Sequence, residues 1–582
     1  MNATRRRCLA VLAAAATLAA CSSREVRNTP LAYVPHDTPY VFANLEPTPD
    51  DVTEAWWALF EPVRAAFAET LAKARKEVAN ADDEAARRTL AVMDLFEDKL
   101  SLEGWERIGF SRRSLVAFYG VGALPVLRIE LADPAALRGF IAQVEAAVGE
   151  ALPVARLGEL EYWRMQPDED KPFAVVMAIV DDQLVLTIDP GAEIAALADM
   201  LGTQRPARSL AETGELEQVN RSHRFGPHGT FLFDVVRLAE SLVGREGGET
   251  WLTRKAAADG DPISAACQRE FGQLAAIMPR MVAGYGRMDA RGMESRMVVH
   301  LRPDLAAGLQ PVAAPVPGLG GLEEGVQAEF GYGLRLDKLG EFLQKQAAAV
   351  AASPWTCDKL ASLNESSGQL GGQVAGLYMA GGLMTGIRVL VTELDWEGLA
   401  MPTRVEGALI VASPNPASLV GMAGGFLPAA SRLQLTPGAP PQRLDLTDLG
   451  EAAAMAPPTW VALSDSALGL GFGEAGGSLL PRFLGASASE PAPVLSFGYR
   501  GPFYARLMKQ VRALQGASDL LAGRDDEAGD EPGRRVQQEM QQVMATFVEA
   551  MDQMSAGVAR TQARFLFTER GLEIVQDMEL AR

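Results

Sequence analysis

Hydrophobic and polar positions alternate along most of this chain in short runs that Gly- and Asp-rich turns separate. Residues 115–131 hold two such runs around a Gly-rich turn, and alternation with a period of two predicts a β-hairpin. Asp133-Pro134 then supplies an N-cap and a first-turn proline, and apolar residues at 137, 140, 141, 144 and 148 predict a helix. The pattern therefore predicts two strands followed by a helix.

The same order of elements returns in the second half of the chain. The helix cap Asp133-Pro134 in the first half matches Asn415-Pro416 in the second, and the hairpin 174–188 with its helix 192–201 matches the hairpin 459–472 with its helix 478–484. The strand and helix of 230–243 match those of 494–511, and the final hairpin turn Arg291-Gly292 matches Arg570-Gly571. A methionine-bearing helix, 271–281 or 536–554, is predicted before each final hairpin. Several ordered matches predict an internal duplication, with convergent α+β patterning as the alternative.

The predicted fold class is α+β, with two related domains that are each an antiparallel sheet packed with helices. The first repeat is predicted over 21–310 and the second over 322–582, joined by a Pro/Gly linker at 311–321, since Gln310 to Gly321 cannot sustain a helix or a strand ladder. A helical arm is expected over 50–107, with a kink at Pro62. An acidic irregular segment is expected over 523–533.

The first residues have the features of an export signal. Arg5, Arg6 and Arg7 form a basic region, residues 9–18 are apolar, and the run is far shorter than the roughly 20 residues that span a bilayer. Leu18-Ala19-Ala20-Cys21 resembles the lipobox of bacterial lipoproteins, which implies removal of residues 1–20 and acylation of the Cys21 thiol. A chance cysteine in an ordinary secretory signal is the alternative.

The resemblance to lipoproteins also implies a location. Ser22 rather than Asp follows Cys21, which in proteobacterial lipoproteins implies transfer to the outer membrane, facing the periplasm. The segment Thr4-Arg5-Arg6-Arg7-Cys8-Leu9 also resembles a twin-arginine export signal, although a simple basic region explains it at least as well. The expected partner is therefore the membrane itself, through the lipid anchor.

The net charge of the mature chain bears on which partners it can bind. Removal of residues 1–20 takes away three Arg and no acid, which leaves 51 Lys and Arg against 74 Asp and Glu, a net charge of −23. A surface this acidic repels nucleic acid and anionic headgroups, so nucleic acid is not an expected partner and a polybasic membrane patch is not expected. The composition, 48% hydrophobic and 22% charged, provides ample apolar material for more than one folded core.

The mature chain contains two cysteines besides Cys21. In an oxidising compartment an even pair is more often bridged than free, so a Cys267–Cys357 disulfide is predicted, with two buried thiols as the alternative.

A short motif follows the export signal. Pro35-His36-Asp37-Thr38-Pro39, placed before a predicted first strand, resembles the opening of an uncharacterised family of bacterial secreted proteins. That resemblance implies an α+β architecture and supplies no catalytic residue.

Local motifs for catalysis are incomplete. The sequence has no H-E-x-x-H, no paired C-x-x-C and no G-x-S-x-G, so no metal, cofactor or catalytic residue is predicted. His223 and His228 lie in a predicted basic loop without a third ligand, and the carboxylate pair Asp181-Asp182 is typical of a turn. Residues 471–476 match G-x-G-x-x-G formally, but they follow a tight hairpin rather than a βαβ unit, so structural glycines are expected.

These observations favour a non-enzymatic lipoprotein of the cell envelope that binds a protein or an apolar ligand. A groove between the domains, lined by methionines such as Met278 to Met281 and Met540 to Met554, is one expected binding place, although the spacing of these methionines favours a buried helix face. The alternative is an envelope hydrolase whose site is assembled from residues distant in sequence. A structural envelope protein is a third possibility.

Overall fold

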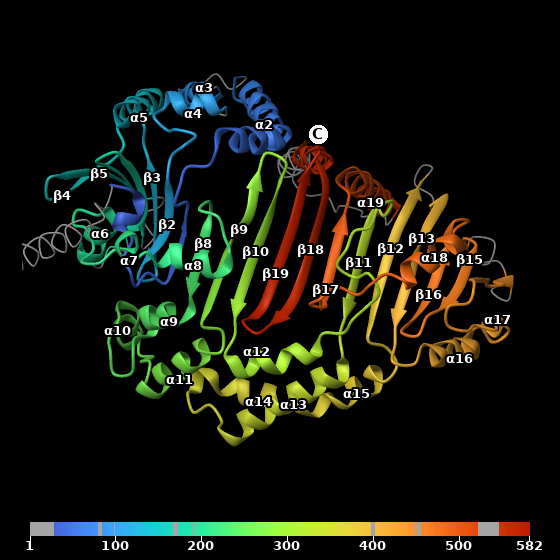
Figure 1. The fold of residues 1–582 in the computed structure, drawn as a ribbon. Coiled ribbons are helices and arrows are strands. Elements are labelled where there is room, and N and C mark those ends of the chain that lie inside the picture. The colour runs from blue at the N-terminus through green and yellow to red at the C-terminus, as the bar shows by residue number, and fades with distance from the viewer. Residues whose placement is uncertain are drawn as a thin grey trace, which may run out of the picture. The chain divides into compact units, whose positions relative to one another are not determined.

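The structure is a computed structural model that describes residues 28–79, 84–97, 99, 101–166, 173–189, 191, 194–396, 402–447, 450, 456–521 and 546–581. Helices and one predominant antiparallel sheet make it an α+β protein, which confirms the predicted fold class (Figure 1). The chain divides into two compact units, one with residues up to Pro47 and Leu102–Thr230, the other with Thr48–Ser101 and Phe231–Arg582.

Unit 1 is built mainly of antiparallel strands. Its elements are η1 (Pro30–Tyr33), β1 (Tyr40–Ala43), α4 (Leu102–Arg107), β2 (Val116–Val121), β3 (Leu124–Glu130), α5 (Pro134–Val148), β4 (Val154–Leu157), β5 (Leu160–Met165), β6 (Ala174–Val180), β7 (Gln183–Asp189), α6 (Ile194–Leu201), α7 (Leu210–Thr213) and α8 (Glu215–His223). The helix α5 begins where the sequence predicts, because the Asp133 side chain accepts hydrogen bonds from Ala135 N and Ala136 N.

Unit 2 holds the remaining elements. Its helices are α2 (Asp50–Ala79), α3 (Glu84–Glu97), α9 (Val235–Val243), α10 (Trp251–Ala258), α11 (Ala265–Ala275), α12 (Pro303–Leu309), η3 (Gln310–Val312), α13 (Leu336–Ala352), η4 (Asp358–Leu360), α14 (Ala361–Gln373), α15 (Ala375–Gly381), α16 (Pro416–Phe426), α17 (Pro428–Ser431), α18 (Gly476–Leu484) and α19 (Gly501–Leu521). Its strands are β9 (Arg280–Asp289), β10 (Gly292–His300), β11 (Ala328–Gly333), β12 (Gly386–Asp395), β13 (Arg404–Ala412), β14 (Gln442–Arg443), β15 (Thr459–Leu463), β16 (Ala467–Phe472), β17 (Leu495–Tyr499), β18 (Val558–Thr568) and β19 (Gly571–Leu580), with nearly all of β8 (Thr230–Asp234).

Strand pairing follows the same order in both halves of the sequence. In the first half β1 pairs with β2, β2 with β3, β3 with β7, β7 with β6 and β6 with β5. In the second half β11, β12, β13, β16, β15 and β14 pair in the same succession. The chain β8, β9, β10 is likewise matched by β17, β18, β19. The internal duplication stays a prediction, and this shared order is an observation in its favour.

The final hairpins of the two halves pair with each other through β10 and β19. Gly292 faces Glu579, and Gly571 faces His300, so each turn glycine lies opposite the eighth residue after the other. The register of this antiparallel pair is therefore symmetric about Arg296 and Val575.

Some expected elements differ from the observed ones. The predicted helix over 271–281 ends at Ala275, and Met281 lies in β9 opposite Val299, because the chain turns at Pro279 and enters the sheet. The predicted linker lies inside unit 2, where Val312, Val316 and Leu319 are buried. These apolar side chains cover one face of the sheet, so the segment packs as part of the core rather than as an exposed connection.

Candidate ligand-binding face

One face of the unit 2 sheet is apolar, and in the described part of the chain it is exposed at Phe330 and Phe497. We call it the open face, defined by the outward positions of nine neighbouring strands, β8, β9, β10, β19, β18, β17, β11, β12 and β13. Directly paired residues of antiparallel strands point to the same side, so the registers identify its members. They include Phe231, Phe233, Tyr285, Met297, Ile574, Phe565, Leu495, Phe497, Phe330, Tyr332, Val389 and Leu409.

The open face of these nine described strands carries no Asp, Glu, Lys, Arg or His. Its most exposed members are Phe330 and Phe497, with 49% and 38% of their surface accessible, and they lie directly opposite each other on β11 and β17. Phe497 also contacts Phe565, with ring centroids 6.2 Å apart, and Tyr499 stacks on Tyr504 of α19 at 4.4 Å. Exposed aromatic side chains that touch one another form an apolar patch, not scattered single residues.

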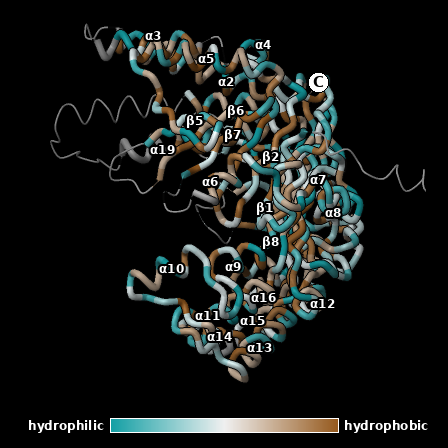
Figure 2. Tube along the Cα trace, turned by 90° about the vertical axis from the view of Figure 1, so that its left-hand side faces the viewer, coloured by the Kyte–Doolittle hydropathy of each residue, from teal (hydrophilic) through white to brown (hydrophobic). Residues whose placement is uncertain are grey.

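The opposite face of the same strands holds the charges, although it is the covered side. Arg388 is fully buried and donates to Glu329 at 2.9 Å, to Glu323 at 3.0 Å and to the carbonyl oxygens of Pro317 and Gly321. Burial raises the pKa of Glu329, and the neighbouring Arg388 opposes that rise. The sheet thus places paired polar groups inside and aromatic groups outside, the reverse of the usual arrangement. Figure 2 shows the hydropathy of each residue along the Cα trace.

Unit 1 has a face of the same kind. Phe42 of β1 and Phe118 of β2 are opposite each other, with 40% and 41% of their surface accessible. The pairing row continues through Leu127, Leu186 and Met177. The corresponding row in the second half is Phe330, Val389, Leu409, Leu470 and Val461. Apolar residues thus occupy the same rows of the two pairing patterns.

A pocket of about 300 Å³ lies where the open face meets α19. We call it the Trp396 pocket; its apolar lining comes from Leu394, Trp396, Phe503, Leu507 and Ala513. Leu394 pairs with Val405 on the open face, so the pocket continues the apolar surface of β12. Its polar lining is Asp395, Arg506, Lys509 and Gln510. This is a combination of apolar walls and cationic groups that sequence reasoning did not identify.

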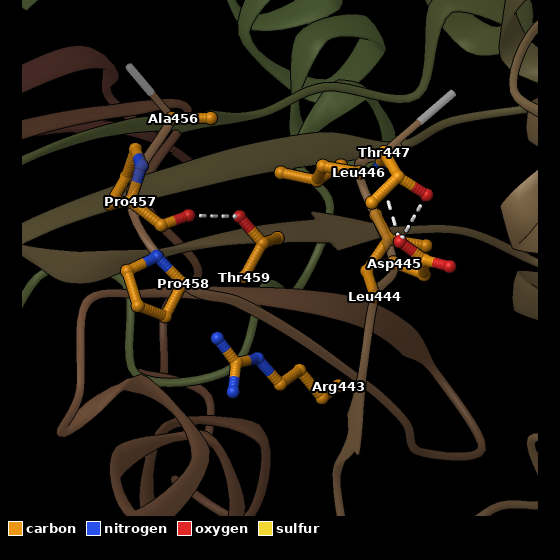
Figure 3. A pocket seen from close by; sticks show the side chains of 9 residues that line it. All are labelled: Arg443, Leu444, Asp445, Leu446, Thr447, Ala456, Pro457, Pro458 and Thr459. Carbon is orange, nitrogen blue, oxygen red and sulfur yellow. Dashed lines mark hydrogen bonds between the residues drawn. The ribbon is translucent and has the colours of Figure 1, made fainter. Parts of the chain in front are cut away.

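Two further hollows are less informative. A groove of about 960 Å³ in unit 1 is lined by Glu46, Glu130, Asp182, Glu217 and Arg221 among mixed apolar residues. A hollow of about 430 Å³ in unit 2 lies between residues 443–447 and 456–459, where the Asp445 carboxylate accepts hydrogen bonds from Thr447 (Figure 3). The contacts drawn in Figure 3 are those of local turns and suggest no chemistry.

The structure brings Cys267 and Cys357 together. Their sulfur atoms are 2.07 Å apart, and the disulfide joins α11 to the loop before η4. Glu270 supports the junction by accepting hydrogen bonds from Thr356 N, Thr356 Oγ1 and Cys357 N, and these bonds lower the pKa of its carboxyl. Cys21, the predicted lipidation site, lies outside the described residues.

The predicted histidine and acid candidates occupy structural positions. His223 is buried and stacks on Phe225, whereas His228 Nδ1 contacts the carbonyl oxygen of Glu46. Among the described residues, the one group with metal-ligand types in reach of one another is Cys267, Cys357 and Asp358, and its two sulfurs are already bonded together. Asp181 accepts a hydrogen bond from the Tyr33 hydroxyl.

The backbone N–H groups of the glycine motif at 471–476 are hydrogen-bonded to a carboxylate of the protein itself. The Glu406 carboxylate accepts hydrogen bonds from Glu474 N at 3.1 Å and Ala475 N at 3.0 Å, directly before α18. A phosphate bound at this helix start would need these same N–H groups. The carboxylate satisfies them, as expected for structural glycines.

Comparisons with protein-family models, with curated proteins and with solved structures find no match to this chain. Among the described residues, no helix has the length and apolar character that crossing a membrane requires.

Proposed function

We propose that this protein is a lipid-anchored, non-enzymatic binding protein of the cell envelope that holds apolar ligands with acyl-chain chemistry on its open face. The observation that carries the proposal is the pair Phe330 and Phe497, exposed on adjacent strands of a nine-strand face whose described residues include no ionisable side chains other than tyrosine. The lipobox resemblance at Cys21 and the residue Ser22 support a place on the periplasmic side of the outer membrane.

The chemistry of the open face favours acyl chains over polar ligands. In the middle of the sheet the backbone N–H and C=O groups of each strand are directed to its neighbours, so they offer a ligand no hydrogen bonds. Covering the accessible part of Phe330 and Phe497 removes roughly 100 Å² of apolar surface for each ring, worth about 2–3 kcal/mol apiece. An apolar ligand gains this energy without leaving a polar group unpaired.

A fluorescence titration with the neutral apolar probe N-phenyl-1-naphthylamine tests the proposal. The protein is the full mature chain with Cys21→Ser, which removes the acyl acceptor. We expect saturable binding that weakens at least about tenfold in the double variant Phe330→Ser, Phe497→Ser. The matched control is Phe426→Ser on α16, because Phe426 is 89% accessible but lies outside the open-face rows.

Three results would contradict the proposal. Absence of saturable binding to the unaltered chain would show that the open face does not hold apolar ligands. An equal loss in the Phe426→Ser control would show that the probe reports any exposed aromatic ring. Stable co-purification of a stoichiometric envelope protein that occupies the open face would replace the acyl ligand with a protein partner.

The alternative, an envelope hydrolase, rests on one observation in unit 1. Glu130 and Asp182 line the 960 Å³ groove, burial raises the pKa of Glu130, and the Asp182 charge raises it further. A carboxyl group whose pKa is raised, next to a second carboxyl group, is an arrangement that general acid–base hydrolysis uses. Neither His223 nor His228 lines this groove. Cleavage of an envelope polymer that Glu130→Gln abolishes would favour this alternative over binding alone.

A further inference from the structure

The Trp396 pocket has an apolar wall and a cationic rim in a strongly acidic protein. Leu394, Phe503 and Leu507 supply the wall, and the volume of about 300 Å³ is at the lower end of the range for small-molecule sites. Phe503 is buried, so the wall is fixed by the packing of α19 on the sheet. Trp396 adds a flat aromatic surface beside it.

The two cations of the rim are Arg506 and Lys509, which are exposed and three residues apart on α19. Residues three apart on a helix are neighbours, and like charges at this spacing repel each other. Neither side chain makes an ion pair with a described residue, although acidic residues outnumber basic ones in this chain by 74 to 54. Asp395 is the one acidic residue among the described lining residues, so these residues carry an excess of one positive charge.

The pocket is continuous with the open face. Val389 and Val391 lie on that face of β12, and after a β-bulge Leu394 returns to the same side opposite Val405. A ligand that lies along β12 therefore reaches Arg506 and Lys509 at its end.

We propose that the Trp396 pocket binds the anionic head of an amphiphile, a carboxylate or phosphate, whose acyl chain lies on the open face. This inference rests on the proposed function and adds the class of head group. Arg506 offers up to five N–H donors and Lys509 three, enough to bind every oxygen of a carboxylate or phosphate.

Calorimetric titration with decanoate, decyl phosphate, decanol and inorganic phosphate tests the inference, again with the full mature chain carrying Cys21→Ser. We expect decanoate and decyl phosphate to bind about tenfold more tightly than decanol. The double variant Arg506→Gln, Lys509→Gln should remove that advantage and leave decanol unchanged. Raising the salt concentration should weaken the anionic ligands selectively, since the rim is exposed.

The matched control removes two positive charges elsewhere. Lys345→Gln, Arg443→Gln changes the net charge equally, and both residues are exposed and distant in sequence from the pocket. We expect it to alter decanoate binding less than about twofold, since screening limits long-range effects.

The outcomes separate this inference from the proposed function. If decanol and decanoate bind equally, or the control pair weakens decanoate as much, the head-group inference is wrong and the acyl site stands. If inorganic phosphate alone competes fully with decanoate, the pocket is a free-anion site and the amphiphile is excluded. If none of the decyl ligands binds, the proposed function itself is refuted.

Discussion

Removal of the carboxylate that neutralises Arg388 should destabilise unit 2 more than any exposed charge change. Arg388 and Glu329 both have side chains with 0% accessibility and lie 2.9 Å apart. The substitution Glu329→Gln leaves a buried guanidinium with Glu323 and two carbonyl oxygens. Loss of one partner of a buried pair costs about 3–5 kcal/mol, and Glu323 compensates part of it, so we expect about 3 kcal/mol.

Calorimetry measures this cost as a shift in melting temperature. Unit 2 spans about 400 residues, so 3 kcal/mol corresponds to a lowering of about 3–4 °C. The matched control is Glu323→Gln, which removes a carboxylate from the same guanidinium but at a site where 25% of the side chain is accessible. Glu329 still pairs with the buried guanidinium in this variant, so the expected cost is at most about 1 kcal/mol.

Replacing Arg388 instead of Glu329 should make the loss of stability depend on pH. In Arg388→Met the counter-charge is lost, so the pKa of Glu329, already raised by burial, rises further. A carboxyl whose pKa is higher in the folded than in the unfolded state loses stability as the pH rises through the interval between those two values. The variant should therefore lose more stability relative to the unaltered chain at pH 7.5 than at pH 4.5. A pH-independent difference, or equal effects of Glu329→Gln and Glu323→Gln, would refute the reasoning.

Three further predictions concern other parts of the chain. Replacing Cys267 and Cys357 by serine should lower the free energy of unfolding, measured by chemical denaturation, by about 2–4 kcal/mol, since the disulfide joins residues 90 positions apart. A decrease below about 0.5 kcal/mol would show that the disulfide does not restrict the unfolded chain. Glu406→Ala should lower the stability by about 1–3 kcal/mol, because two N–H groups before α18 lose their acceptor, and an unchanged denaturation midpoint would contradict this account. Glu130→Gln should flatten the decline of stability with rising pH, because burial raises the pKa of Glu130 in the folded state; an unaltered pH profile would contradict that assignment.

The sequence predicted local structure well where short-range chemistry determines it. The Asp133-Pro134 cap, the 174–188 hairpin and the turns at Gly292 and Gly571 are observed at or near the predicted positions. Each depends on a few neighbouring residues whose backbone preferences are strong. Met281 was assigned to a helix because apolar residues in a short window fit either period, and only the pairing with Val299 places it in β9.

The candidate site was not predictable in the same way. Period-two alternation shows that Phe330 and Glu329 point to opposite sides of a strand, but hydrophobicity alone assigns the aromatic side to the core. The structure reverses this assignment, because the segment that includes Val316 and Leu319 covers the side of Glu329 and Arg388. The Trp396 pocket joins residues more than a hundred positions apart, so no local motif signals it.

The sequence by itself determined the α+β class, the order of most elements, the acidic surface and the expectation of a lipid anchor at Cys21. These properties follow from local backbone preferences, composition and short motifs, which act within a few residues. Tertiary structure alone decided which sheet face is covered, that Arg388 meets Glu329 in the interior, and that Arg506 and Lys509 lie at the end of an apolar surface. Those outcomes depend on long-range packing, in which each side chain's environment is set by segments far away in the sequence.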